Sequence, residues 1–83
     1  MADYFNFQQV AQKCGIAKST IAQLQSKGLL EPTIKKGMAF LSSQQVYRLR
    51  IAVQRAKKER TELQEALARV EAHWLAQTIA LNR

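Results

Sequence analysis

Four polar side chains close together in the sequence could recognise a polyanion. Lys18, Ser19, Thr20 and Gln23 offer an ammonium group, two hydroxyl groups and a carboxamide. Ammonium and hydroxyl groups donate hydrogen bonds to phosphate oxygens, and a glutamine can form two parallel hydrogen bonds with the edge of an adenine. These residues are therefore candidate ligands for a nucleic acid. The simpler alternative is an ordinary solvated helix face.

A second group of candidate residues is purely cationic. Lys35 and Lys36 stand directly before Gly37, and Arg48 follows further along the chain. Such side chains neutralise phosphates and fix the position of a protein on a duplex without reading its sequence. The alternative is that they only keep a loop and a helix face in solution.

Other reactive side chains lack the neighbours that catalysis or metal binding needs. The Ser and Thr hydroxyls have no His or Lys arranged to activate them, and His73 has no Cys, Asp or second His at ligand spacing. Cys14 is the single cysteine, which excludes a disulfide within the chain and a cysteine-rich metal site. We therefore expect no enzymatic activity, no metal ion and no cofactor.

The charge is distributed unevenly along the 83 residues, which carry 13 Lys and Arg against 6 Asp and Glu. Residues 1–60 hold eleven basic and three acidic side chains, a net charge of +8, whereas residues 61–83 hold two and three, a net charge of −1. A small basic domain is typical of proteins that bind nucleic acid. The last segment is expected to have a different role.

No segment is typical of a secretion signal or a membrane span. The first seven residues are acidic and polar, and no apolar run approaches the roughly 18 residues that a membrane helix needs. We expect a cytoplasmic protein associated with the nucleoid.

The elements that must hold the polar group are two short helices. Asn6 with Gln9 forms a capping box, and the apolar residues that follow, Phe7, Val10, Ala11 and Cys14, have the spacing of one helical face. Gly15 is expected to end this helix. A second helical pattern with Ala17, Ile21 and Leu24 on one face runs to Gly28. Two helices joined by so short a turn predict a helix-turn-helix.

A β-hairpin is predicted after the second helix. Two short apolar stretches, Leu29 to Ile34 and Met38 to Leu41, flank Lys35-Lys36-Gly37, and Pro32 favours an edge position for the first strand. A hairpin with lysines at its tip, directly after a helix-turn-helix, has the arrangement of a wing.

The remainder of the chain predicts a long helix that opens at a capping box, Ser42 with Gln45. Its apolar stripe has three- and four-residue spacing and comprises Val46, Leu49, Val53, Ala56, Leu63, Leu67, Val70, Trp74 and Leu81. We favour a continuous helix, because no Gly or Pro occurs after Met38. The alternative is a break near Lys57 to Arg60, with Thr61 and Gln64 as a third capping box.

Several of these motifs occur together in a known family. They are Phe5-Asn6-Phe7, Val10-Ala11, Gly15-Ile16, Thr20-Ile21, Gly28-Leu29-Leu30 with Pro32, the wing glycine Gly37, and Ser42. In this combination the chain resembles the MerR family of bacterial winged-helix regulators over about residues 4–55. The resemblance implies a DNA-binding domain whose second helix enters the major groove.

The chain also departs from that family. Ala22-Gln23-Leu24 stands where Arg-Tyr-Tyr is usual, and Met38-Ala39 stands where the wing usually has Tyr-Arg. The family's operator preference and promoter-twisting mechanism therefore do not carry over. We expect no effector-binding domain for a small molecule, and in this respect the chain resembles short members such as excisionases and small terminase subunits more than the longer regulators.

The combined prediction is a mainly α-helical fold, with a winged helix-turn-helix over residues 1–58 and a coiled-coil helix over residues 59–83. We expect a sequence-specific regulator that binds double-stranded DNA as a homodimer. The alternatives are an architectural factor that assembles a nucleoprotein complex and, less favoured, an adaptor that binds protein. DNA contacts are expected from Lys18, Ser19, Thr20, Gln23, Lys35, Lys36 and Arg48. Dimer contacts are expected from Leu63, Leu67, Val70, Trp74 and Leu81, and the resemblance favours an antiparallel pair.

Overall fold

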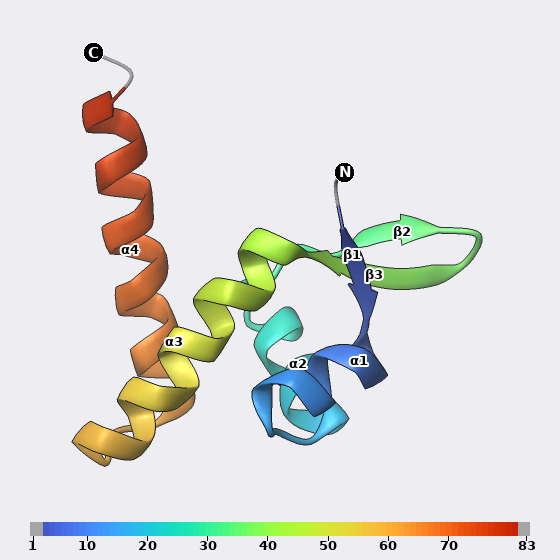
Figure 1. Ribbon diagram of the computed structural model, residues 1–83, viewed down its shortest axis with the longest axis horizontal. Coiled ribbons are helices and arrows are strands. Elements are labelled where there is room, and N and C mark those ends of the chain that lie inside the picture. Colours follow the sequence, from blue (N-terminus) through green and yellow to red (C-terminus); the bar gives the residue numbers. More distant parts are fainter. Residues whose placement is uncertain (1–2, 82–83) are drawn as a thin grey trace.

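The computed structural model describes residues 3–81, and the side chains of residues 3–77. Its elements are β1 (Tyr4–Asn6), α1 (Phe7–Cys14), α2 (Lys18–Ser26), β2 (Thr33–Lys35), β3 (Met38–Ser42), α3 (Ser43–Glu59) and α4 (Leu63–Leu81) (Figure 1).

The helix-turn-helix forms as predicted, and the interactions that begin and end its first helix join residues close together in the sequence. The Asn6 side chain accepts a hydrogen bond from the Gln9 backbone N–H at 2.8 Å, and the Gln9 side chain accepts one from the Asn6 N–H at 2.9 Å. Gly15 has a φ of 69° and donates its N–H to the Ala11 carbonyl, which ends α1. This left-handed conformation favours glycine. Only three residues separate α1 from α2.

The wing is also present, within a sheet that has one strand more than predicted. The strand order is β1-β3-β2, and both pairings are antiparallel. Lys36 and Gly37 both have positive φ, 52° and 77°, as the two-residue turn of a tight hairpin requires. The sequence analysis missed β1, in which Phe5 lies opposite the buried Leu41.

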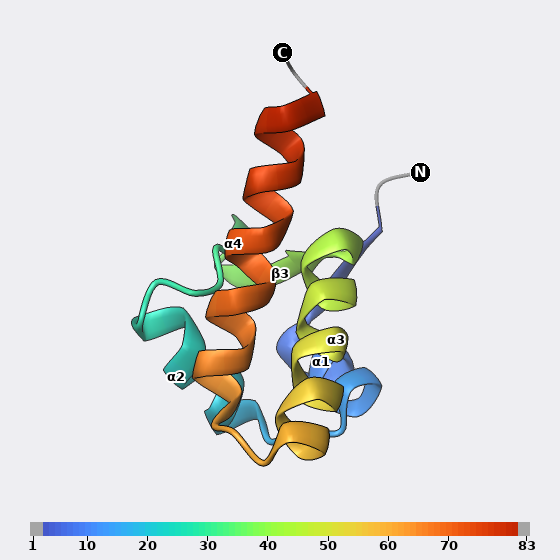
Figure 2. The ribbon, with the colours of Figure 1, turned by 90° about the vertical axis from the view of Figure 1, so that its left-hand side faces the viewer.

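The prediction of one continuous helix is wrong, and the alternative prediction, a break near Lys57 to Arg60, is correct. Arg60 adopts a left-handed φ of 56° and ends α3, and the Thr61 N–H is donated to the Ala56 carbonyl. The chain then turns back, so that α4 lies alongside α3 (Figures 1 and 2). The third capping box does not form, because the Thr61 hydroxyl has no hydrogen-bond partner and Gln64 donates to Glu62.

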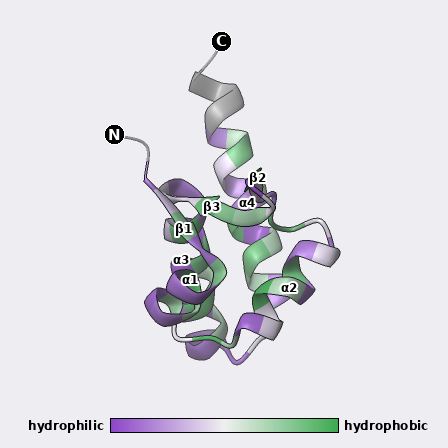
Figure 3. Cartoon of the chain, turned by 90° about the vertical axis from the view of Figure 1, so that its right-hand side faces the viewer, coloured by the Kyte–Doolittle hydropathy of each residue, from purple (hydrophilic) through white to green (hydrophobic). Residues whose placement is uncertain are grey.

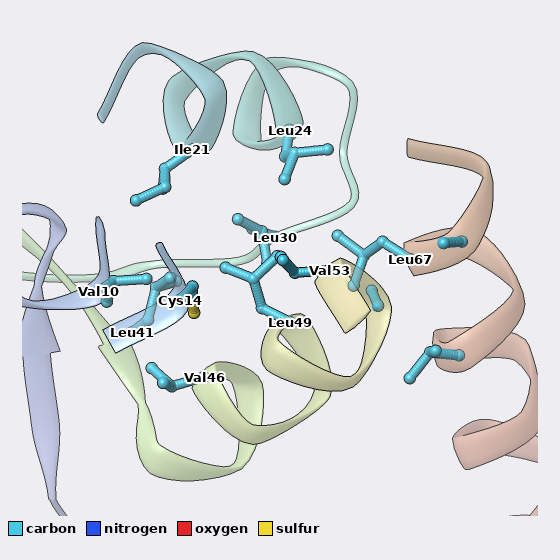
Figure 4. Close-up of a cluster of buried hydrophobic side chains, with 13 residues drawn as sticks. Val10, Cys14, Ile21, Leu24, Leu30, Leu41, Val46, Leu49, Val53 and Leu67 are labelled. Atoms are coloured by element: carbon cyan, nitrogen blue, oxygen red, sulfur yellow. The ribbon is translucent and has the colours of Figure 1, made fainter. Parts of the chain in front are cut away.

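This reversal changes what covers the apolar stripe of the last helix. Leu67 is completely buried and Val70 nearly so, and both belong to the same hydrophobic cluster as Val10, Ile21 and Leu49. Figure 4 shows Leu67 reaching from α4 towards Val53 of α3. The expected dimer contact is therefore wrong for Leu67 and Val70, which are buried within the chain itself. Leu63 is half-buried against the same cluster.

The second half of the stripe is more exposed. The Trp74 side chain is 38% exposed and that of Leu75 is 60% exposed. Leu81, the last residue of the predicted dimer contact, lies outside the described side chains.

Because Leu67 completes the core, Leu67→Ala is expected to lower the free energy of unfolding by about 2–5 kcal/mol, the cost of a Leu-to-Ala cavity in a packed interior. Tyr47→Ala is the control, because it truncates a large side chain that is 58% exposed on α3. It should change stability by less than about 0.5 kcal/mol. Urea unfolding of both variants followed by circular dichroism makes the comparison. Equal losses in the two variants would contradict the packing of α4 on the winged part.

Candidate nucleic-acid interface

Helix α2 presents a polar face at the surface. Ile21 and Leu24 are buried and point into the core (Figure 4). Lys18, Ser19 and Gln23 are exposed, while Thr20 is half-buried. Figure 3 shows α2 at the surface, with hydrophobic and hydrophilic residues alternating along it. The four polar residues predicted from the sequence therefore belong to one helix, but they do not share one direction.

Lys18 lies on the side of α2 that faces the wing. It lines a shallow hollow together with the start of α1 (Asn6, Phe7 and Gln8) and with Met38 and Ala39 of β3. An ammonium group at this place faces the gap between α2 and the hairpin.

Thr20 and Gln23 lie on the opposite flank, where α2 meets the beginning of α4. They line a second hollow with Lys27, with Glu62 of the α3–α4 turn and with Gln64 at the start of α4. The Lys27 ammonium donates a hydrogen bond to Gln64 Oε1, and Gln64 Nε2 donates to Glu62 Oε2 at 3.2 Å. The chain reversal thus places an amide and a carboxylate beside Gln23.

The two wing lysines are exposed at the tip of the hairpin. The Lys35 Nζ atom lies 4.7 Å from the centre of the Tyr4 ring, a cation–π geometry in which the charge remains accessible to solvent. Lys36 is the first residue of the turn, and it is exposed. Both cations lie on the element that flanks the Lys18 side of α2.

Arg48 is not on this surface. Its Nε donates to Glu71 Oε1 at 2.9 Å, its side chain is only 11% exposed, and its guanidinium lies 5.2 Å from the centre of the Trp74 ring. Arg48 thus joins α3 to α4. It is omitted from the interface proposed below.

The sequence analysis missed the second flank of α2. Lys27 follows Gln23 by four residues, a spacing that places both on the same side of the helix. This spacing could have indicated Lys27 from the sequence. Glu62 and Gln64 gave no such signal, because their place beside α2 depends on the turn at Arg60.

Cys14 does not add chemistry to this surface. Its side chain is buried, and burial raises the pKa of the thiol, while Arg50 and Lys13 lower it to a smaller extent. Residues 3–81 contain no group of three or more His, Cys, Asp or Glu placed to hold a metal ion. Within the same part of the chain, no helix is both long and apolar enough to cross a membrane.

The chain was compared with known families, with curated proteins and with solved structures. Neither the curated proteins nor the solved structures gave a match. The family described as MerR HTH family regulatory protein matches residues 5–70, which include both helices of the helix-turn-helix, the wing, α3 and the first half of α4. With most of its length matched and its helix-turn-helix and wing formed, the chain belongs to the MerR helix-turn-helix family of regulatory proteins.

Proposed function

We propose that this protein binds double-stranded DNA sequence-specifically as a homodimeric transcriptional regulator, with α2 in the major groove and the wing on the neighbouring backbone. The observation that carries the proposal is the exposed polar face of α2, flanked by the cationic wing. Membership of a DNA-binding regulator family supports the same function. The proposed contacts are Lys18, Ser19, Thr20 and Gln23 from α2, and Lys35 and Lys36 from the wing.

The residues of α2 and those of the wing have different tasks in this arrangement. Gln23 reads a base edge, because its carboxamide is exposed and can pair with adenine. Lys18, at the hollow between α2 and the wing, reaches a guanine edge, whereas Lys35 and Lys36 contact phosphates from the wing. Ser19 and Thr20, in the first turn of α2, donate to a phosphate from a helix N-terminus.

Binding should weaken steeply as salt is added, because lysines that neutralise phosphates release the counterions of the duplex. With about four to six phosphates neutralised, a plot of log K against log salt concentration should have a slope of about −4 to −5. Fluorescence anisotropy with a labelled duplex at several salt concentrations measures this slope. No binding at about 50 mM salt, a concentration low enough for phosphate contacts to be strong, would contradict the proposal and favour a protein-binding adaptor.

Substitutions on α2 and on the wing should have different effects. Gln23→Ala should cost about 1–3 kcal/mol of discrimination between the preferred base pair and a wrong one, and Lys18→Ala should also relax sequence preference. Lys35→Ala combined with Lys36→Ala should weaken binding to all duplexes alike, because phosphate contacts carry no sequence information. Selection of binding sites from random duplexes compares the variants. An unchanged motif in both α2 variants would mean that another face of α2 enters the groove.

The dimer contact is proposed at the second half of α4. Since Leu67 and Val70 are used within the chain, the contact must rely on Trp74 and Leu75 and on the residues that follow them. This part of α4 extends beyond the body of the molecule (Figures 1 and 2). Two α4 helices that meet there bury apolar surface and place two α2 helices on one duplex, so binding sites should contain paired half-sites.

Sedimentation equilibrium at tens of micromolar protein tests the dimer. The intact chain should sediment as a dimer, and Leu75→Asp should produce a monomer, because a carboxylate would be buried without a partner in the interface. Tyr47→Asp is the control, since Tyr47 is exposed to a similar degree but lies on α3. A monomeric intact chain would refute the dimer and leave monomers that bind repeated sites.

A further inference from the structure

The surface formed by α2 and the wing accounts for only part of the positive charge of this protein. It uses Lys18, Lys35 and Lys36, whereas a further group of exposed cations lies on α1 and α3. This group comprises Lys13, Arg50, Lys57 and Lys58. Among the side chains of residues 3–77, no ion pair engages any of these four cations. Their charges are therefore not neutralised within this part of the chain.

These cations gather where α1 packs on α3. Arg50 and Lys57 are two helical turns apart, so they project from the same side of α3. Burial raises the pKa of the Cys14 thiol, and the charges of Arg50 and Lys13 both oppose that rise. Both charges therefore lie near Cys14, at the contact between the two helices. Lys13 of α1 and Arg50 of α3 thus belong to one surface.

The rest of this surface is polar. Tyr47 and Gln54 lie beside the cations of α3, and both are exposed. Helix α1 contains no Asp or Glu, and the single acidic residue of α3, Glu59, forms an ion pair at 3.8 Å with Arg69 on the α4 side of that helix. Figure 3 shows hydrophilic residues gathered on α1 and α3, across the molecule from α2. We call this surface the α1–α3 face, and its residues are Lys13, Tyr47, Arg50, Gln54, Lys57 and Lys58.

The α1–α3 face points away from the DNA contact proposed for α2. In Figure 4 the buried cluster lies between α2 and α3, with Ile21 and Leu24 entering it from α2 and Leu49 entering it from α3. Tyr47 and Gln54 lie on the side of α3 opposite its buried residues, so they face outward on the far side of the cluster from α2. A duplex held by α2 and the wing therefore leaves this face open.

The composition of the α1–α3 face identifies the class of its partner. Ammonium and guanidinium groups, a phenol hydroxyl and a carboxamide are the groups with which proteins contact phosphate oxygens. A protein partner would favour an apolar centre, and Tyr47 is the single large apolar side chain among the six residues. Single-stranded nucleic acids stack successive bases on several aromatic rings, and this face offers one ring. The phosphates of a duplex fit the six residues best.

We propose that the α1–α3 face binds the backbone of a second DNA duplex without regard to its sequence, so that one protein molecule bridges two duplexes. This inference goes beyond the proposed function and rests on it for the first duplex, which α2 and the wing hold. Arg50 and Lys57 are about 10 Å apart along α3, so the face is long enough to contact more than one phosphate of a strand. Bridging of this kind is an architectural activity, and it is compatible with sequence recognition by α2.

The experiment measures the capture of a second duplex by the full chain. A duplex that carries the site selected from random sequences is fixed to beads and loaded with the protein, and a labelled duplex of unrelated sequence is then added. The unmodified chain should retain the second duplex at about 50 mM salt and release it as salt is added. Arg50→Gln combined with Lys57→Gln should lower this capture at least about tenfold, because two phosphate contacts are lost.

Arg55→Gln combined with Arg69→Gln is the matched control. It removes the same amount of charge from exposed sites, but Arg55 projects from another side of α3 and Arg69 lies on α4. This control should retain the second duplex. The two double variants should bind the selected duplex with equal affinity in anisotropy measurements. Since all four substituted side chains are exposed, both variants should unfold at the temperature of the unmodified chain.

Two results would overturn the inference. Equal capture by the two double variants would mean that another surface holds the second duplex, such as α2 of the other protomer in a dimer. No capture by the unmodified chain would mean that the face binds no duplex. Binding of a labelled polyglutamate peptide, lost in Arg50→Gln with Lys57→Gln, would then assign the face to an acidic protein segment.

Failure of the proposed function gives a different result. In that case the unmodified chain selects no sequence from random duplexes. If it still binds duplexes of any sequence, and Arg50→Gln with Lys57→Gln weakens this binding more than the control does, the α1–α3 face binds DNA although α2 does not.

Discussion

The packing of α4 on α3 and on the winged part is the contact on which the rest of the structure depends. It requires Arg60 to adopt a left-handed conformation, which costs a non-glycine residue about 1 kcal/mol. The reversal of the chain buries Ala66, Leu67 and Val70, and a fully buried leucine alone contributes about 1.5–3 kcal/mol to stability. Burial therefore outweighs the conformational cost, and the reversal needs no glycine or proline.

Two properties of the candidate interface follow from this reversal. The start of α4 comes to lie beside α2, where Gln64 accepts from Lys27 and donates to Glu62. Further along α4, Glu71 comes to lie beside Arg48, and the ion pair between them holds that guanidinium away from the surface of α2 and the wing. One turn in the chain thus adds an amide and a carboxylate to the flank of α2 and removes an arginine from the expected contacts.

The features that could be predicted from the sequence depend on residues a few positions apart. The capping box at Asn6, the glycine that ends α1 and the wing turn each act over at most four residues, and all three are present. At Ser42 only half of the predicted capping box forms, because the Ser42 hydroxyl accepts from the Gln45 N–H while Gln45 Oε1 has no hydrogen-bond partner. They were sufficient to predict the helix-turn-helix, the wing and the start of α3. The lysines of the wing and the polar residues of α2 could be placed for the same reason.

What the sequence did not predict depends on residues far apart. The periodicity of Leu63, Leu67 and Val70 shows which side of a helix is apolar, but it does not show whether another molecule or the same chain covers it. Without a glycine or proline at the turn, the continuous helix was the simpler interpretation. Strand β1 has only three residues and forms because Phe5 can pair opposite Leu41 of β3, so its own sequence carries little signal.

The outward side of α2 consists of small residues. Ser19, Ala22 and Ser26 have the spacing of one helical face, opposite Ile21 and Leu24, and the Ser26 hydroxyl is already donated to the Gln23 carbonyl. Small side chains at the centre allow the helix backbone to approach bases closely in the proposed mode of binding. The longer groups that can discriminate between bases then act from the two flanks. Because one flank is bounded by the wing and the other by α4, the proposed recognition of DNA sequence would depend on both chain reversals and not on α2 alone.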